Sequence, residues 1–184
     1  HPAIALGLAT VLSLGLAACG SAPTSSASSS GGSGTTSDFK ACMVSDEGGF
    51  DDQSFNQSGK EGLDRAGADF GIETVAVESK SAADYPTNVD SLIQQKCNLI
   101  IGVGFNLADD MTKAAKQNPA VRFALIDAQF TEAGLPNAKP LIFNTAEAAY
   151  LAGYAAAGTT KTGKVATYGG QAIPTVQIFM DGFA

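Results

Sequence analysis

Histidine is nearly absent from this chain, because the only one is His1, and tryptophan is missing altogether. Histidine is the side chain that most often acts as a general base in enzymes, and it is one of the usual ligands of zinc. Since no imidazole lies in the body of the chain, the sequence excludes serine hydrolysis by a histidine base and any metal site built on histidine.

Several nucleotide-binding and metal-binding motifs are also lacking. The chain has no G-x-G-x-x-G and no G-x-x-x-x-G-K-[ST], which are the loops that hold the phosphates of dinucleotides and nucleoside triphosphates, and no paired C-x-x-C. With 18 acidic against 11 basic residues, the net charge is −7, and no basic stripe is present to bind a nucleic-acid backbone. We expect no cofactor, no metal and no nucleic-acid partner.

Charge is absent from the first 37 residues, which contain no Asp, Glu, Lys or Arg. The run IALGLATVLSLGLAAC, which ends at Cys19, has the apolar core of a secretory signal and is short for a membrane span. LAAC fits the lipobox of bacterial lipoproteins, in which a diacylglyceryl group is attached to the cysteine; an ordinary signal peptide is the alternative. We expect a signal peptide over 1–19, clipped at its N-terminus because no methionine or basic segment precedes Ile4.

Residues 20–37 consist of Ser, Gly, Thr and Ala with a single Pro. Such a segment has too little apolar area to offset the entropy lost on ordering, so we expect a flexible tether.

The rest of the chain alternates short β-branched runs with amphipathic segments, which is typical of βαβ units and a doubly wound parallel sheet. The expected strands are 39–46, 71–79, 97–105, 121–127 and 139–145, and the expected helices are 54–70, 84–96 and 106–118. A helix over 146–160, a strand over 164–170 and a helix from Pro174 follow. We therefore expect a complete lobe over 38–144 and the start of a second, truncated lobe over 145–184.

Ligands of open α/β sheets bind beyond the carboxyl ends of the strands. Those ends carry Asp46, Gly104 with Phe105, and Asp127 in this sequence. The glycine permits a close approach of the backbone to a ligand, and Phe105 or Phe55 provides an apolar wall. Asp46 and Asp127 could also face each other as the carboxylate pair of a glycosidase.

The acidic stretch DEGGFDDQSFNQ (46–57) has Gly48 where a calcium-binding EF-hand needs Asp or Asn, which argues against a calcium loop. We interpret Ser54 and Gln57 as a capping box for the helix that follows. The charges of Glu47 and Asp51 are interpreted as solvated. For Asp52, a solvated charge at the start of the helix is one reading, and the sequence leaves it open.

The same stretch resembles the N-terminal signature of the basic membrane protein (BMP) family. The segments IIGVGF, FALIDAQF, EAAYLAGY, GKV and IPTVQIFMDGF match as well, so the resemblance covers 38–184. Members of this family are lipid-anchored substrate-binding proteins of ABC importers, among them receptors for purine nucleosides. The resemblance implies a type I periplasmic-binding-protein fold, in which two Rossmann-like lobes close over a ligand.

The resemblance also implies roles for individual residues. Asp46 and Asp127 match positions that hydrogen-bond the nucleoside, Phe55 the aromatic residue that stacks on the base, and Asn56 its polar neighbour. Gly104 and Phe105 lie on the matching loop, and the hinge is expected over 143–145. The implied protein is not an enzyme. It is anchored through Cys19 at the extracytoplasmic face of the cell membrane, where it would serve an ABC permease and its ATPase.

Two questions stay open from the sequence alone. Cys42 and Cys97 lie on strands that a 2-1-3 order makes neighbours, so they form either a disulfide or two buried free thiols. The ligand is a nucleoside, or the same scaffold binds a sugar or a signalling molecule; an exported carbohydrate hydrolase is the alternative from another class.

Overall fold

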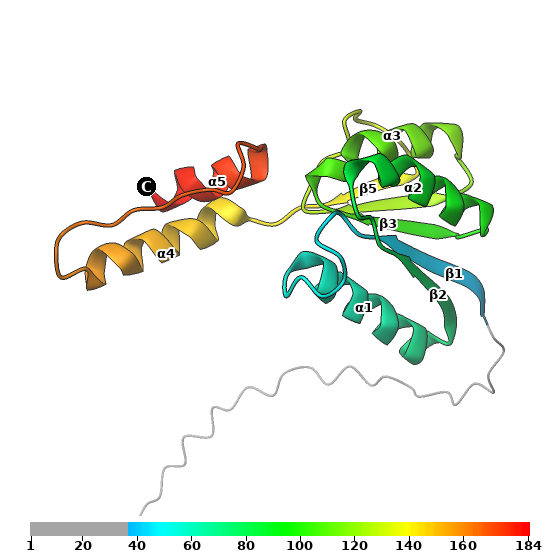
Figure 1. The fold of residues 1–184 in the computed structure, drawn as a ribbon, viewed down its shortest axis with the longest axis horizontal. Coiled ribbons are helices and arrows are strands. Elements are labelled where there is room, and N and C mark those ends of the chain that lie inside the picture. Colours follow the sequence, from blue (N-terminus) through cyan, green and yellow to red (C-terminus); the bar gives the residue numbers. More distant parts are fainter. Residues whose placement is uncertain (1–36) are drawn as a thin grey trace, which may run out of the picture. The chain divides into compact units, whose positions relative to one another are not determined.

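The computed structural model describes residues 37–184. The predicted signal peptide, nearly all of the predicted tether and the lipidation site Cys19 lie outside the described residues. Five strands form one parallel sheet in the order β2-β1-β3-β4-β5 (Figure 1). The strands are β1 (Ser37–Val44), β2 (Ile72–Val77), β3 (Leu99–Val103), β4 (Arg122–Ile126) and β5 (Ala138–Leu141).

Helices cover both faces of this sheet, as a doubly wound fold requires. On one face lies α1 (Phe55–Phe70), and on the other lie α2 (Tyr85–Gln94) and α3 (Ala108–Gln117) (Figure 1). Two short 3₁₀ turns, η1 (Ala82–Asp84) and η2 (Phe105–Leu107), lead into α2 and α3. The predicted α/β fold class and the 2-1-3 strand order are confirmed.

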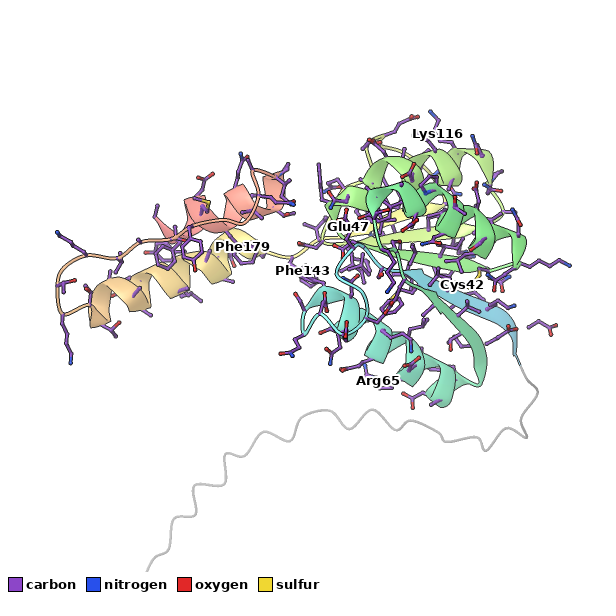
Figure 2. The ribbon with its side chains drawn as sticks, in the orientation of Figure 1. Cys42, Glu47, Arg65, Lys116, Phe143 and Phe179 are labelled. Carbon is purple, nitrogen blue, oxygen red and sulfur yellow. A yellow bond between two sulfur atoms is a disulfide. The ribbon has the colours of Figure 1, made fainter. Side chains whose placement is uncertain are left out.

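Strand β1 shows how one apolar run supplies both cores. Successive side chains of a strand point to opposite faces. Cys42 and Val44 therefore enter the core beneath α2 and α3, whereas Ala41 and Met43 join Leu63 of α1 in the second core. All five side chains are buried, and Figure 2 shows side chains between the sheet and the helices. The sheet is thus fixed from both sides.

After β5 come α4 (Thr145–Thr159) and α5 (Pro174–Phe183). The two helices pack closely, because Gly153 of α4 faces the carbonyl oxygen of Phe183, and a Cβ at Gly182 would lie 2.6 Å from the Ala146 oxygen. The helix predicted to open at Pro174 is present. The predicted lobe boundary at residue 144 stays a prediction, and it falls between β5 and α4.

The strand predicted over 164–170 is wrong, because this segment is irregular and exposed. A strand needs a neighbour for its backbone N–H and C=O groups. Within residues 37–184 the only sheet is the one that β1 to β5 form, and the segment does not join it.

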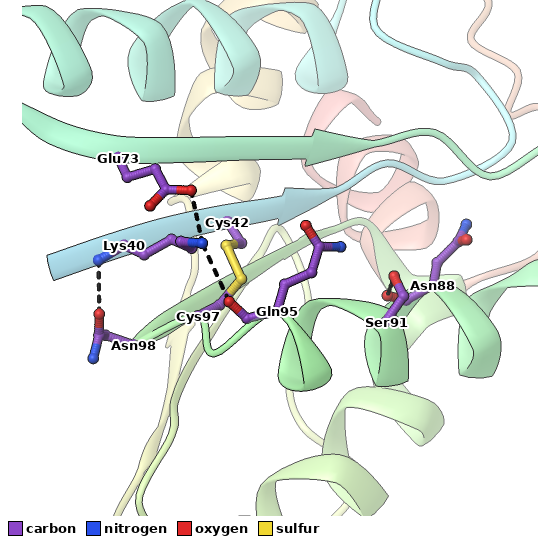
Figure 3. The surroundings of a disulfide bond; sticks show 8 residues. All are labelled: Lys40, Cys42, Glu73, Asn88, Ser91, Gln95, Cys97 and Asn98. Carbon is purple, nitrogen blue, oxygen red and sulfur yellow. Dashed lines mark hydrogen bonds and ion pairs between the residues drawn. A yellow bond between two sulfur atoms is a disulfide. The ribbon is translucent and has the colours of Figure 1, made fainter. Parts of the chain in front are cut away.

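A disulfide joins Cys42 of β1 to Cys97, which precedes β3, with their Cα atoms 6.0 Å apart (Figure 3). Both residues are buried. Beside them, Lys40 forms an ion pair with Glu73 at 2.7 Å, and its backbone N–H donates to Asn98 Oδ1, also at 2.7 Å. The structure therefore contains the bridged alternative that the sequence left open, and the bridge links the interior of β1 to the segment that precedes β3.

Removing this disulfide should lower the free energy of unfolding by about 4 kcal/mol, the chain-entropy value for a cross-link that closes a loop of this size. The bonded cysteines are 55 residues apart. Urea unfolding of the oxidised protein and of the protein kept in reductant measures the difference. A Cys42→Ala/Cys97→Ala variant should unfold at the same urea concentration as the reduced wild type, and adding reductant should not change its unfolding curve. Equal midpoints for oxidised and reduced protein would contradict the prediction.

Candidate ligand-binding site

The candidate site lies at the carboxyl edge of the sheet. Asp46 comes two residues after β1, Gly104 directly follows β3, and Asp127 directly follows β4. Since these strands are parallel and adjacent in the order β1-β3-β4, their ends meet at one edge. Phe55 begins α1 and Phe105 begins η2, which places both aromatic residues at the same edge.

Asp46 is held in one orientation by hydrogen bonds to one of its two carboxylate oxygens. Oδ1 accepts from the backbone N–H of Gly48 at 2.9 Å and from Nδ2 of Asn56 at 2.7 Å. The backbone N–H of Asp46 returns a bond to Asn56 Oδ1 at 3.2 Å. The other oxygen, Oδ2, accepts no hydrogen bond from residues 37–184, so it is the atom available to a donor on a ligand.

Asn56 is 2% exposed, and both hydrogens of its side-chain amide donate hydrogen bonds within the protein. One binds Asp46, and the other binds Asp52 Oδ2 at 2.9 Å. An amide nitrogen has two hydrogens to donate. The contacts described here therefore make Asn56 a support for Asp46, and the direct ligand contact expected from the sequence stays a prediction.

Asp52 caps the N-terminus of α1. Its Oδ1 accepts from the backbone N–H groups of Ser54 at 2.9 Å and Gln57 at 3.0 Å, and its Oδ2 accepts from that of Asn56 at 3.2 Å. Ser54 makes no side-chain cap bond, and Gln57 Oε1 accepts from Gln53 instead. The predicted Ser54–Gln57 capping box is wrong, because the nearby carboxylate takes the free backbone donors. The same contacts exclude the reading of Asp52 as a merely solvated charge, which the sequence left open.

These contacts set the pKa of Asp52. Desolvation by burial works toward a higher pKa, but the hydrogen bonds from Gln57, Ser54 and Asn56 outweigh it, and the pKa lies below its ordinary value of 3.8. The carboxylate therefore stays ionised down to acidic pH, and an ionised cap is favourable at a helix N-terminus.

The loop before Asp52 is fixed at two further points that the sequence did not indicate. Glu78, just after β2, accepts the backbone N–H of Phe50 at 3.0 Å. The hydroxyl group of Tyr85 donates to Glu47 at 3.4 Å. Desolvation, followed by the charges of Glu47 and Asp46, raises the pKa of Tyr85 to about 12, so its hydroxyl group remains a donor. Glu47, interpreted as a solvated charge, has this contact as well.

Gly104 makes room for the Asp46 carboxylate. Its φ of +89° is unfavourable for any residue with a side chain, and a Cβ there would lie 3.1 Å from Asp46 Oδ2. The sequence assigned this glycine to close approach of a ligand. In the structure, the group that lies close to Gly104 is the carboxylate of Asp46, which is itself a predicted ligand-binding residue.

Asp127 shows the features of a ligand-binding carboxylate. It has a φ of +57°, which is uncommon for a non-glycine residue, and its N–H donates to the Leu141 carbonyl at 2.9 Å. Its carboxylate has no hydrogen bond or ion pair within residues 37–184, and burial raises its pKa. Strained backbone and an unpaired, partly buried acceptor are typical of functional positions.

Three aromatic side chains near this edge are half exposed: Phe55 at 41%, Phe105 at 40% and Phe143 at 53%. Phe143 belongs to the segment between β5 and α4 and is labelled in Figure 2. Its ring lies against that of Phe55, with the centroids 5.8 Å apart. From the sequence, we expected Phe143 in a hinge and did not predict its contact with Phe55. The only hint in the sequence is the apolar pair Ile142-Phe143 just after the last strand.

No three His, Cys, Asp or Glu side chains are grouped to hold a metal ion among the residues that the structure describes. In the same residues, no helix has the length and apolarity needed to cross a bilayer.

Comparison with known proteins identifies the family. Residues 39–184 match the model of the Bmp family, described as ABC transporter substrate-binding protein PnrA-like. The chain belongs to the Bmp family. Its members are substrate-binding proteins of ABC transporters and not enzymes, which removes the carbohydrate-hydrolase alternative.

Relatives of the Bmp family agree with this assignment. A CD4+ T-cell-stimulating antigen of Listeria innocua is 36% identical over 97% of this chain and 51% of its own length. The ABC transporter nucleoside-binding protein BmpA of Lactococcus lactis is 39% identical over 79% of this chain and 42% of its own length. The chain thus spans about half the length of the curated relatives that it matches.

A solved structure of similar fold is an ABC transporter solute-binding protein from Aeropyrum pernix. It is 28% identical, with a TM-score of 0.66 over 79% of this chain and 41% of that chain.

Replacing the Asp52 cap should destabilise the protein at neutral pH. Asp52→Ala should lower the free energy of unfolding by about 1 kcal/mol, the usual cost of a lost helix cap. The folded-state pKa is depressed, so the ionised group stabilises the fold above its unfolded pKa, and this contribution is lost as pH falls through the folded pKa. The difference between wild type and variant should therefore shrink below about pH 4. Urea unfolding at a series of pH values measures it.

Ser54→Ala is the matched control, because Ser54 occupies the N-cap position without a side-chain cap bond. A larger loss from Ser54→Ala than from Asp52→Ala would refute the assignment of the cap.

Asp127→Asn should raise thermal stability at pH 7. The pKa of Asp127 is raised by burial, so the ionised form costs folding free energy above the folded pKa, and the cost disappears as pH falls below the unfolded pKa. Asparagine avoids this cost and tolerates positive φ. Melting curves at pH 7 and at about pH 3.5, below the ordinary Asp pKa, should show the gain only at the higher pH. Asp69→Asn, at an exposed position, should have no such effect; a less stable Asp127→Asn protein at pH 7 would contradict the reasoning.

Proposed function

We propose that the full-length protein is an extracytoplasmic nucleoside-binding protein of an ABC importer, and that its ligand is a purine nucleoside. The observation that carries this proposal is the pair of strand-end aspartates, Asp46 and Asp127, which offer unpaired carboxylate oxygens at the edge where Phe55 is exposed. The Lactococcus relative named as a nucleoside-binding protein supports the same ligand class.

The chemistry of these groups suits a nucleoside. An ionised carboxylate is purely a hydrogen-bond acceptor, and ribose hydroxyl groups and base N–H groups are donors. The flat, apolar face of a base stacks favourably on a phenylalanine ring. A purine has the larger flat surface, so more apolar area leaves water when it stacks.

In the proposed protein, α4 and α5 begin the second lobe, and the hinge lies over residues 143–145. The proposal includes anchoring of Cys19 by lipid at the outer face of the cytoplasmic membrane. It also includes delivery of the ligand to a permease driven by an ATPase subunit. The lipobox and the Ser/Gly-rich composition of residues 20–37 support the anchor.

Titration calorimetry of the full-length protein tests the ligand. Adenosine, guanosine and inosine should bind more tightly than uridine or cytidine, and ribose or glucose should give no heat. Asp46→Ala should weaken binding by about 1–3 kcal/mol, the cost of leaving a buried polar partner unpaired. The absence of heat from every nucleoside would reject the proposal.

Asp51→Ala is the matched control, because Asp51 is an exposed carboxylate on the same loop without a side-chain hydrogen bond. The Asp51→Ala variant should bind nucleosides with the same affinity as the wild type. Binding of a sugar that survives Phe55→Ser would instead assign the scaffold to sugars.

A further inference from the structure

The ring of Phe143 lies against Phe55, the ring proposed to stack on the base. The centroids are 5.8 Å apart and the planes are inclined by 43°. This distance is within the range in which aromatic pairs attract each other. The contact therefore stabilises the protein without ligand, and it places the Phe143 ring directly beside that of Phe55.

The space between the two rings is too small for a third ring. Carbon atoms in contact lie about 3.5 Å apart, so a base sandwiched between two rings needs about 7 Å between the outer planes. The observed pair is closer than that and is tilted. A base that stacks on Phe55 from the side where Phe143 lies must take the place of Phe143.

Phe143 is in a position to move. It is 53% exposed, and it lies in the irregular segment Ile142–Asn144 between β5 and α4. Within residues 37–184, its carbonyl oxygen accepts one hydrogen bond, a long one from Thr145 Oγ1 at 3.5 Å. By contrast, Phe55 begins α1 beside the buried Asn56, so its backbone is fixed.

We propose that Phe143 is a placeholder, which occupies the face of Phe55 on which the base stacks and is displaced when the ligand binds. The inference rests on the proposed function and deepens it, because it adds a residue that sets the affinity of the same site. Phe143 lies on the segment that connects β5 to α4. Its displacement by a ligand would therefore also change the conformation of this connecting segment.

If Phe143 is a placeholder, removing this aromatic ring beside the site should strengthen ligand binding, whereas removing a ring that contacts the ligand would weaken it. In calorimetry of the full-length protein with adenosine and inosine, Phe143→Ala should bind about 2- to 10-fold more tightly, the factor equivalent to one lost aromatic pair. Phe143→Leu, which keeps apolar bulk without a ring, should fall between Phe143→Ala and wild type. The matched control is Phe70→Ala, at an exposed phenylalanine that ends α1 at the other end of this helix. It should leave affinity unchanged.

A second measurement follows the ring directly. With 4-fluorophenylalanine incorporated at position 143, the fluorine resonance should shift when adenosine is added to the full-length protein. The same label at position 70 should not respond.

The possible results separate this inference from the proposed function. If nucleosides bind the wild type and Phe143→Ala binds equally or more weakly, or if the label at position 143 does not respond, the placeholder is overturned while the proposed function stands. If no nucleoside binds either protein, the proposed function is overturned and the placeholder with it.

Discussion

The geometry of the candidate site depends on the buried amide of Asn56. Its two hydrogens bind the carboxylates of Asp46 and Asp52, and its oxygen accepts the backbone N–H of Asp46. A buried amide left without partners costs about 1–3 kcal/mol, so the end of β1, the loop and the first turn of α1 are held in one arrangement. That arrangement engages one oxygen of Asp46 and leaves the other without a hydrogen-bond partner within residues 37–184.

The neighbouring strands end in backbone conformations that the sheet itself maintains. Gly104 after β3 and Asp127 after β4 both have positive φ. A non-glycine residue in that region costs about 1–2 kcal/mol. The N–H of Gly104 bonds Ile126 at 2.9 Å and that of Asp127 bonds Leu141, also at 2.9 Å, so the ladder continues one residue beyond each strand. The positive-φ conformation of Asp127 is thereby held in place at the end of β4.

Much of the fold could be predicted because its signals are local. Apolar β-branched runs separated by amphipathic segments indicated the five strands, their parallel direction and the edge that carries Asp46 and Asp127. The strand expected over 164–170 failed, because strand formation needs a partner as well as propensity. The cap on α1 was assigned to Ser54, because spacing alone does not show that the carboxylate of Asp52 reaches the same donors.

The sequence by itself determined the fold class, the family signature and the strand-end residues, since these follow from hydrophobic periodicity and residue type along the chain. Only the tertiary structure decided, for residues 37–184, which oxygen of Asp46 is free, that the Asp127 carboxylate has no partner, and that the rings of Phe143 and Phe55 are in contact. The reason is physical: these properties depend on distances between residues that are far apart in the chain, and such distances are set by the packing of the sheet and its helices.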